Sequence, residues 1–285
     1  MPNLRDVKNR IRSVKNTQQT TKAMKLVSAS KLRRAQEAIL TARPYATKMR
    51  DVLNHLSARC NHDLHPLLND REGNKVLLVI ITADRGLCGA FNANIIKMAS
   101  QIIEENRDSD ISLFLAGKKG GDYFKRRPYK IQENYPGWTK EFNYAKAVEI
   151  GEKLGDLFVE GTVDRIFLVY NEFKSVLRQE VIREQLLPIE PEETEDAHPV
   201  DYIYEPDEES ILEDILKRYM TLQVYRAFLE SSASEHGARM TAMDNASRNA
   251  KEMIGQLTLF YNRTRQAYIT KELIEVVNGA EALKD

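Results

Sequence analysis

The stretch RQAYITKELIEVVNGAEALKD, from Arg265 to Asp285, is the part of the sequence that determines the fold. Read as a helix, it carries two apolar stripes about a quarter-turn apart. Their members are Ile269, Leu273, Val276 and Ala280 on one stripe and Ile274 and Val277 on the other. A helix that is apolar on two sides is expected to be buried. The sequence therefore predicts that other protein surrounds this last segment.

Two long helices are predicted at the ends of the chain, over residues 4–56 and 210–283. In both, apolar residues recur every seven positions, which is typical of a coiled-coil seam. The first seam begins at Leu4 and Val7 and is polar between residues 18 and 28. The second helix would be on the order of 110 Å long at 1.5 Å per residue. Such a length favours an arm of a coiled coil over a globular core helix.

An alternating α/β segment lies between these helices. Strands are expected at 75–84, 111–117, 164–173 and 176–189, and helices at 92–106 and 141–161. Continuous apolar strands that alternate with helices are typical of a parallel or mixed sheet covered on both faces. The predicted fold is a Rossmann-like, three-layer α/β domain with a mixed sheet, inserted between two long helices that form an antiparallel left-handed coiled coil.

Four parts follow from this interpretation. They are an N-terminal coiled-coil helix (1–57), a linker (58–74), an α/β foot domain (75–205) and a C-terminal coiled-coil helix (206–285). The last helix is longer than the first, so roughly 20 of its residues would lack a partner in their own chain. We expect these residues to need a sleeve supplied by other subunits.

Composition and charge limit the class of protein. Hydrophobic residues make up 42% and charged residues 29% of the chain, and no run approaches the roughly 18 apolar residues typical of a membrane span. Residues 1–50 contain thirteen Lys and Arg against two acidic residues, whereas 184–214 contain thirteen acidic residues and no Lys or Arg. These segments are interpreted either as solvated faces or as docking surfaces of opposite charge.

The segment TADRGLCGAFN, residues 82–92, follows the first strand where a nucleotide-binding loop would lie. Its glycines, Gly86 and Gly89, match neither the dinucleotide fingerprint nor a P-loop. A tight turn is therefore favoured over a nucleotide site. The dipeptide Asp84-Arg85 could pair across a cleft, but it is weak evidence for catalysis.

Other chemistry has little support. Three potential metal ligands lie close together, namely Cys60, His62 and His65, but no second cluster completes the usual four. The basic first helix could attract phosphates, although no aromatic residue for base stacking precedes Tyr45. We therefore predict no catalytic residue, no cofactor and no metal, and we favour no nucleic-acid partner. A stand-alone α/β enzyme with a pocket in residues 75–190 and a coiled-coil nucleic-acid binder are the alternatives.

Three stretches together resemble the gamma subunit of the F-type ATP synthase, in its bacterial form. They are TKAMKLVSASKLRRAQ (21–36), ITADRGLCGAFN (81–92) and ITKELIEVVNGAEAL (269–283). The resemblance implies a non-catalytic central rotor stalk inside a hexamer of alpha and beta subunits, with the catalytic sites on beta. The foot domain would stand with the epsilon subunit on the ring of c subunits, which proton or sodium flow turns.

The resemblance also implies contacts for individual residues. Met24 and Lys25 are expected to meet the moving lever of a beta subunit, and Arg265, Gln266 and Thr270 to contact a beta loop near the top of the shaft. The foot loop expected on the c ring contains Tyr202, Tyr204 and Glu205. The implied location is peripheral, at the cytoplasmic face of the cell membrane, with membrane contact only through the c ring. The inserted cysteine pair of plastid gamma subunits is missing, so thiol control is not expected.

Overall fold

Two compact units make up the chain. The computed structural model describes residues 4–57, 65–71, 73–190 and 208–282. Residues 1–27 and 240–285 form one unit, named here the shaft unit, and residues 28–239 form the other, the foot unit. Both predicted long helices are confirmed and pass through both units: α1 spans Leu4–Ser57 and α6 spans Glu208–Ala282.

The foot unit contains a five-stranded sheet with the strand order β3-β2-β1-β4-β5. Its strands are β1 (Lys75–Ile81), β2 (Asp110–Ala116), β3 (Lys130–Tyr135), β4 (Arg165–Phe173) and β5 (Gln179–Leu187). The first four run parallel, and β5 pairs antiparallel with β4. The predicted mixed sheet is therefore confirmed.

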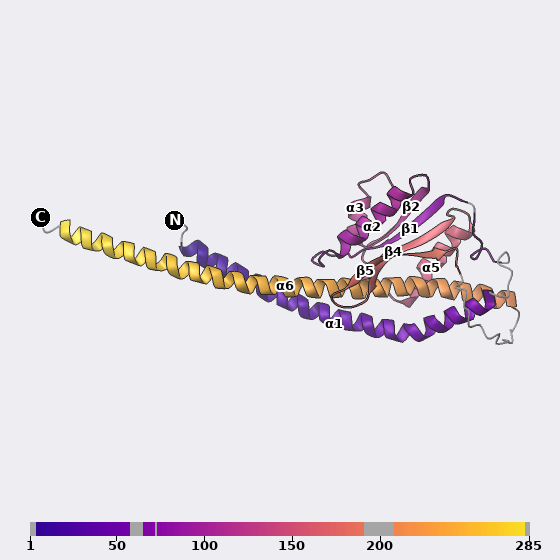
Figure 1. Cartoon of the computed structure of the whole chain (residues 1–285), viewed down its shortest axis with the longest axis horizontal. Helices are drawn as coiled ribbons and strands as arrows, with labels where there is room; N and C mark the ends of the chain where they lie inside the picture. The colour runs from indigo at the N-terminus through magenta and orange to yellow at the C-terminus, as the bar shows by residue number, and fades with distance from the viewer. Residues whose placement is uncertain (1–3, 58–64, 72, 191–207, 283–285) are drawn as a thin grey trace. The chain divides into compact units, whose positions relative to one another are not determined.

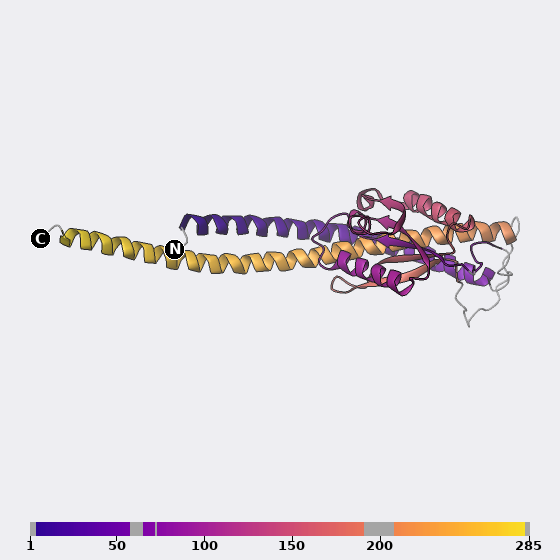
Figure 2. The same ribbon diagram turned by 90° about the horizontal axis from the view of Figure 1, so that it is seen from above.

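Helices cover both faces of this sheet, as Figures 1 and 2 show. They are α2 (Phe91–Glu105) and α3 (Lys118–Phe124) on one face, with α4 (Trp138–Glu141), α5 (Tyr144–Val159) and the first part of α6 on the other. The central strand β1 explains the layering, because its side chains alternate between the faces. Leu77 and Val79 pack with α5 and α6, whereas Leu78 and Ile80 pack with α2, and all four are fully buried.

Within the foot unit, α6 carries apolar residues on two of its sides. A stripe at four-residue spacing packs against the sheet and consists of Leu212, Leu216, Met220, Val224 and Phe228. The predicted seam residues Leu222 and Leu229 instead line a cavity of about 280 Å³ together with Ile39 and Ala46 of α1. A helix that is apolar on both sides can be buried between two neighbours.

The elements α3, α4 and β3 were not predicted. The α3 sequence, KKGGDYF, contains two glycines, which are poor helix formers. β3, KIQENY, is a half-buried edge strand with Ile131 as its one aliphatic residue. Their local patterns are weak, and tertiary packing decides their structure instead. Pro44 lies inside α1, and the helix continues past it.

In the shaft unit, α1 and α6 run antiparallel, and the C-terminal end of α6 extends beyond the first turn of α1 (Figures 1 and 2). Val7, Met243 and Ala250 are buried in the seam. From Ile269 to Ala280 every residue of α6 is exposed. An unpartnered end of the last helix was predicted, and it is present over these twelve residues.

We expect Gly117→Ala to lower the free energy of unfolding by about 3 kcal/mol or more. Gly117 has φ +93°, and an added Cβ would lie 2.1 Å from the carbonyl oxygen of Thr82. Urea unfolding can be followed through Trp138, the one tryptophan, whose indole nitrogen donates to the same carbonyl at 2.8 Å.

The matched control is Gly255→Ala on α6, where an added Cβ meets no atom within 4 Å. Because alanine favours a helix over glycine by about 1 kcal/mol, this change should not destabilise the protein. If Gly117→Ala and the unchanged protein unfolded at the same urea concentration, as followed through Trp138, the backbone at this position would tolerate a side chain.

Candidate functional site

The loop from Thr82 to Asn92 leaves the carboxyl end of β1 at the point where the strand order reverses. Chain connections run from β1 outward to β2 and β3, and then return to β4 on the other side of β1. In open α/β sheets, ligands bind in the crevice at such a switch point, outside the carboxyl ends of the strands. A functional site is therefore expected first at this edge of the sheet.

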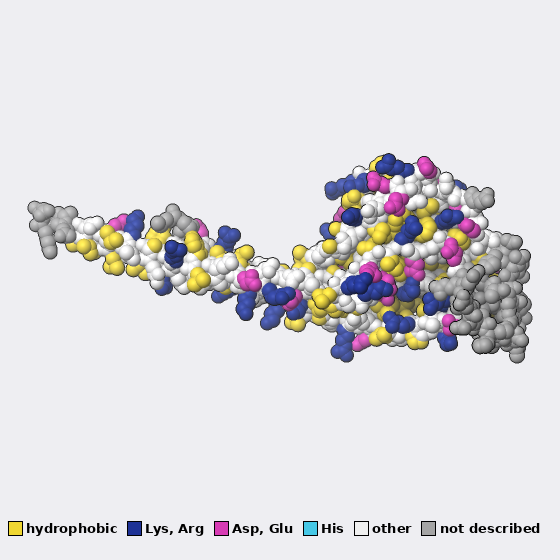
Figure 3. Space-filling model, in the orientation of Figure 1, with side chains coloured by type: hydrophobic (Ala, Val, Ile, Leu, Met, Phe, Trp, Pro, Cys, Tyr) yellow, Lys and Arg dark blue, Asp and Glu magenta, His cyan; other side chains and the backbone are white. Residues whose placement is uncertain are grey.

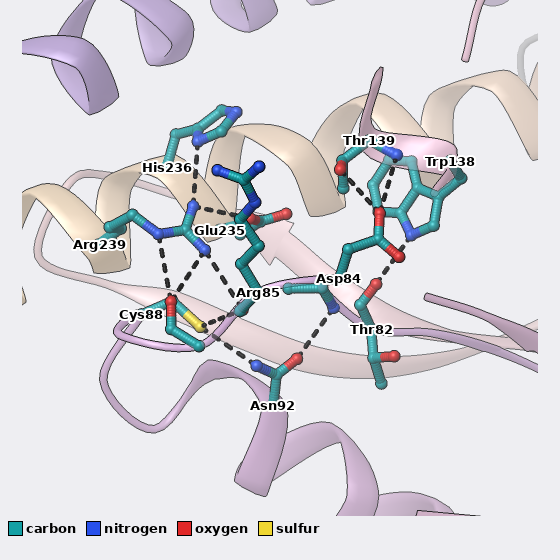
Figure 4. Close-up of polar contacts among 12 residues, drawn as sticks. Thr82, Asp84, Arg85, Cys88, Asn92, Trp138, Thr139, Glu235, His236 and Arg239 are labelled. Carbon is teal, nitrogen blue, oxygen red and sulfur yellow. Dashed lines mark hydrogen bonds and ion pairs between the residues drawn. The ribbon is translucent and has the colours of Figure 1, made fainter. Parts of the chain in front are cut away.

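Side chains from α6 contact the loop and the strand end at this switch point. Ser234 Oγ donates a hydrogen bond of 3.1 Å to the carbonyl of Asn171, near the end of β4. The Arg239 guanidinium donates to the carbonyls of Arg85 and Gly86 at 3.3–3.4 Å (Figure 4). We name these groups the junction: the loop 82–92 with Ser234, Glu235, His236 and Arg239 of α6.

A buried ion pair lies at the centre of the junction. Arg239 Nη1 lies 2.7 Å from Glu235 Oε1, and the two side chains are only 9% and 4% exposed. The same guanidinium lies 3.4 Å from His236 Nδ1 and reaches both loop carbonyls. A planar guanidinium can satisfy several acceptors at fixed angles, which a lysine ammonium cannot do with the same geometry. Glu235 supplies the opposite charge that a buried cation requires.

Burial shifts the pKa of three side chains of the junction toward their neutral forms. Burial, with the positive charges of Arg239 and Lys31, lowers the pKa of His236 to about 4. Burial also raises the pKa of the Cys88 thiol, whose sulfur accepts a hydrogen bond from Asn92 at 3.2 Å. Burial raises the pKa of the Glu235 carboxyl, an effect that Arg239 opposes. A protonated thiol and a neutral imidazole beside a closed ion pair favour structural contacts over nucleophilic or acid–base chemistry.

Asp84 fixes the loop to the neighbouring strand ends. Its Oδ1 accepts hydrogen bonds from the backbone N–H groups of Lys118 at 3.0 Å and Gly137 at 2.7 Å. Its Oδ2 accepts a bond from Thr139 Oγ1 at 2.8 Å. Hydrogen bonds to a carboxylate are stronger than those between neutral groups. Asp84 therefore does not pair with Arg85 across a cleft, and it serves to make the loop rigid.

α6 also passes close to the turn between β4 and β5. A Cβ added at Gly237 would lie 3.2 Å from the ring of Phe173 and 3.8 Å from the Cα of Val176. Glycine is therefore the residue that allows this approach. The long helix is held by the β1 loop through Arg239 and by the β4–β5 hairpin through Ser234 and Gly237.

The predicted contact residues lie apart from the junction. Lys25 is paired with Asp244 at 2.6 Å inside the shaft unit and is 41% exposed, and Met24 is half-buried beside it in sequence. Arg265, Gln266 and Thr270 are exposed on α6. The structure therefore does not bring Met24 and Lys25 together with Arg265, Gln266 and Thr270.

Several expectations fall outside the described residues. The proposed c-ring residues Tyr202, Tyr204 and Glu205 do so, as do Cys60 and His62. Among the residues that the structure does describe, no group of three His, Cys, Asp or Glu is arranged to hold a metal ion. Within the same residues, no helix is long and apolar enough to cross a membrane.

The Glu235–Arg239 pair was not singled out from the sequence. Its signal is an acid and a base four residues apart in the segment from Ala233 to Met240, whose other residues, except His236, are apolar or small. Spacing of four residues is common for exposed helical ion pairs. The sequence alone does not distinguish those from a buried pair that reaches a loop about 150 residues away.

The foot unit is built on an α/β sheet, and two continuous helices connect it to a helical unit with an exposed apolar end. This combination defines a mechanical stalk protein. The sequence matches the ATP synthase family over residues 3–283. It is 49% identical to the ATP synthase gamma chain of Chlorobaculum parvum over 291 residues, and 51% identical to that of Anaeromyxobacter sp. strain Fw109-5 over 290 residues, covering all of each chain.

Solved structures agree. The central stalk and c-ring structure of the Tetrahymena thermophila mitochondrial ATP synthase contains a chain with 28% identity and a TM-score of 0.62, covering 80% of this chain and 99% of that one. A chain of the Euglena gracilis mitochondrial enzyme shares the fold, with a TM-score of 0.72 at 21% identity over 98% of this chain and 94% of that one. The chain belongs to the ATP synthase gamma-chain family, and its role is that of the rotor stalk of an F-type ATP synthase.

We expect the stability of the foot unit to fall between pH 7 and pH 5 in a way that depends on His236. The folded protein holds this pKa near 4, below its ordinary value of 6.5. The unfolded chain therefore binds the proton first, and stability present above pH 6.5 is lost as the pH falls toward 4. The loss from pH 7 to pH 5 should be about 2 kcal/mol greater than in His236→Gln.

Urea unfolding of both proteins at the two pH values, followed through Trp138, measures this difference directly. The glutamine variant keeps a neutral polar group beside Arg239 but cannot take up the proton. Parallel pH profiles for the two proteins would contradict the burial of a neutral imidazole at this position.

Proposed function

We propose that this chain transmits torque, without catalytic groups of its own, between a ring of c subunits in the membrane and a hexamer of alpha and beta subunits. The observation that supports this most is the apolar, unpartnered end of α6. Ile269, Leu273, Ile274, Val276 and Val277 are 47–69% exposed. Figure 3 shows hydrophobic side chains open to solvent along this end of the helix. An exposed apolar surface of this kind indicates a binding partner.

An apolar end suits rotation inside an apolar sleeve. Hydrophobic and dispersion contacts do not depend strongly on direction, so they can be exchanged as the helix turns. Fixed ion pairs would instead hold particular angles. The end of α6 has only one described ion pair, Lys271 with Glu275 at 3.5 Å, and both partners lie on the same helix. This composition is consistent with a bearing.

Polar residues at the start of this end, and just before it, are proposed to contact a beta subunit. Arg265, Gln266 and Thr270 are exposed and free of described ion pairs. Met24 and Lys25 are proposed to meet the moving lever of a beta subunit, and the side chain of Lys25 is 41% exposed although it pairs with Asp244.

The remaining proposed partners contact the foot. Tyr202, Tyr204 and Glu205 are proposed to rest on the c ring, and the epsilon subunit to bind beside them. The chain would then be a peripheral protein of the cytoplasmic membrane face, without nucleic acid or cofactor. The four-part domain division drawn from the sequence, 1–57, 58–74, 75–205 and 206–285, is retained as part of this proposal.

The deciding experiment is co-expression of the full chain with alpha and beta subunits, followed by purification through a tag on this chain. We expect all three to co-purify with ATPase activity. An α/β enzyme acting alone would instead retain activity without alpha and beta, and a nucleotide that stabilised the isolated chain would favour that alternative.

Within the assembled complex, Arg265→Leu should lower ATPase turnover or assembly roughly two- to tenfold, the effect of losing one hydrogen-bonded contact. It should not abolish hydrolysis, because the side chain supplies no reacting group. Arg265→Lys, which keeps the charge, should lose less. A fully assembled complex that binds nucleotide but cannot hydrolyse it after Arg265→Leu alone would overturn the non-catalytic role.

The apolar bearing makes a second, separable prediction. Deleting residues 278–285 should leave reduced but measurable ATPase activity, because the end works by fit. Val276→Asp should be more harmful than the deletion, since an unpaired carboxylate in an apolar sleeve costs several kcal/mol. Rotation-linked ATPase of the two assembled variants measures the order. The reverse order would show that the sleeve around Val276 is polar or absent.

A further inference from the structure

Polar contacts between α6 and the sheet follow a regular row. Arg226 pairs with Glu184 of β5, Glu230 accepts the backbone N–H of Phe173 at 3.0 Å, and Ser234 donates to Asn171. Arg226, Glu230 and Ser234 are spaced by four residues, so they share one face of the helix. All three contacts are made to β4 and β5.

Arg239 breaks this pattern and reaches the opposite side of the switch point. It lies five residues after Ser234 and contacts the loop that follows β1. The row from Arg226 to Ser234 therefore holds α6 from one side only, whereas Arg239 holds it from the other. Hydrogen bonds on two opposite sides can prevent a helix from turning about its own axis, because they are directional. Apolar packing alone resists such a rotation less.

We infer that Arg239, held in place by Glu235, is the positioning residue that fixes the rotation of α6 about its own axis relative to the sheet. It does so at the switch point where a doubly wound sheet otherwise binds its ligand, and the Glu235–Arg239 pair takes the position of that ligand. Its guanidinium donates hydrogen bonds to the backbone carbonyls of the loop. Asp84 makes that loop rigid by accepting hydrogen bonds from Gly137 and Thr139. The mechanical meaning of the lock rests on the proposed function, in which α6 carries torque.

The lock can be tested on the full chain by hydrogen–deuterium exchange measured by mass spectrometry. Arg239→Met keeps much of the buried hydrocarbon but removes all the donors. A peptide covering residues 84–91 should exchange roughly tenfold faster or more, the effect of losing charge-assisted hydrogen bonds. Peptides from β1 and β2 should keep their protection.

Three further variants separate positioning from general stability. Arg239→Lys keeps the charge but not the fork, and should restore only part of the loop protection. Glu235→Gln keeps a hydrogen-bond acceptor and should give a smaller acceleration than Arg239→Met. The matched control is Arg248→Met, which removes an exposed i,i+4 pair with Asp244 at 3.3 Å and should leave the 84–91 peptide unchanged.

The same variants have a mechanical readout in the complex with alpha and beta subunits. With the shaft held in the hexamer, the angular fluctuations of a bead attached to the foot unit should widen in Arg239→Met and stay unchanged in Arg248→Met. If the chain does not assemble with those subunits, the proposed function fails while the exchange result still decides the lock.

Two results would overturn the inference. Loop exchange that is the same in Arg239→Met and the unchanged protein would show that the guanidinium does not hold the loop. Acceleration of equal size in the 84–91, β1 and β2 peptides would show a general structural role with no local lock. If Arg239→Met does not fold, Arg239→Lys and Glu235→Gln give the same comparison with smaller changes in packing.

Discussion

The contact between α6 and the sheet is held by two kinds of interaction that act in different directions. An apolar stripe, including Leu216, Val224 and Phe228, is completely buried and sets how closely the helix approaches the strands. Such contacts are strong in total but weakly directional. The hydrogen-bonded groups that follow along the helix fix its rotation, because their geometry is satisfied over a narrow range of angles. The β1 loop and the β4–β5 hairpin are built around these groups.

The use of the switch-point crevice follows from this arrangement. A doubly wound sheet opens a polar crevice at its carboxyl edge, where backbone groups of the loop need partners. Here a helix of the same chain supplies partners, the guanidinium of Arg239 for two loop carbonyls and the hydroxyl of Ser234 for the carbonyl of Asn171 in β4. The buried charge is compensated by Glu235 of the same helix, so it requires no external ion. A fold common among nucleotide-binding proteins thereby becomes a clamp for a helix.

The sequence was sufficient for elements whose signal is local. The heptad spacing of α1 and α6 and the continuous apolar run of β1 indicate their structures directly. It was insufficient for α3 and β3, whose glycines and polar residues acquire their structure from packing. It also missed the junction, because Arg239 and Gly86 are 153 residues apart and only folding brings them together. The predicted contact residues Met24, Lys25, Arg265, Gln266 and Thr270 rest on family resemblance alone, since their proposed partners are other proteins.

One helix serves several environments along its length, and its composition changes accordingly. In the foot unit, α6 is apolar toward both the sheet and α1. In the shaft unit, its Asp244 forms a half-exposed ion pair with Lys25. Beyond Tyr268 every described side chain up to Ala280 is exposed and many are apolar. No proline interrupts residues 208–282, so the backbone hydrogen-bond ladder is continuous from the junction to that end. Twist applied at the foot can then pass along the helix only if its first part cannot turn on the sheet, which is the condition that the Arg239 contacts meet.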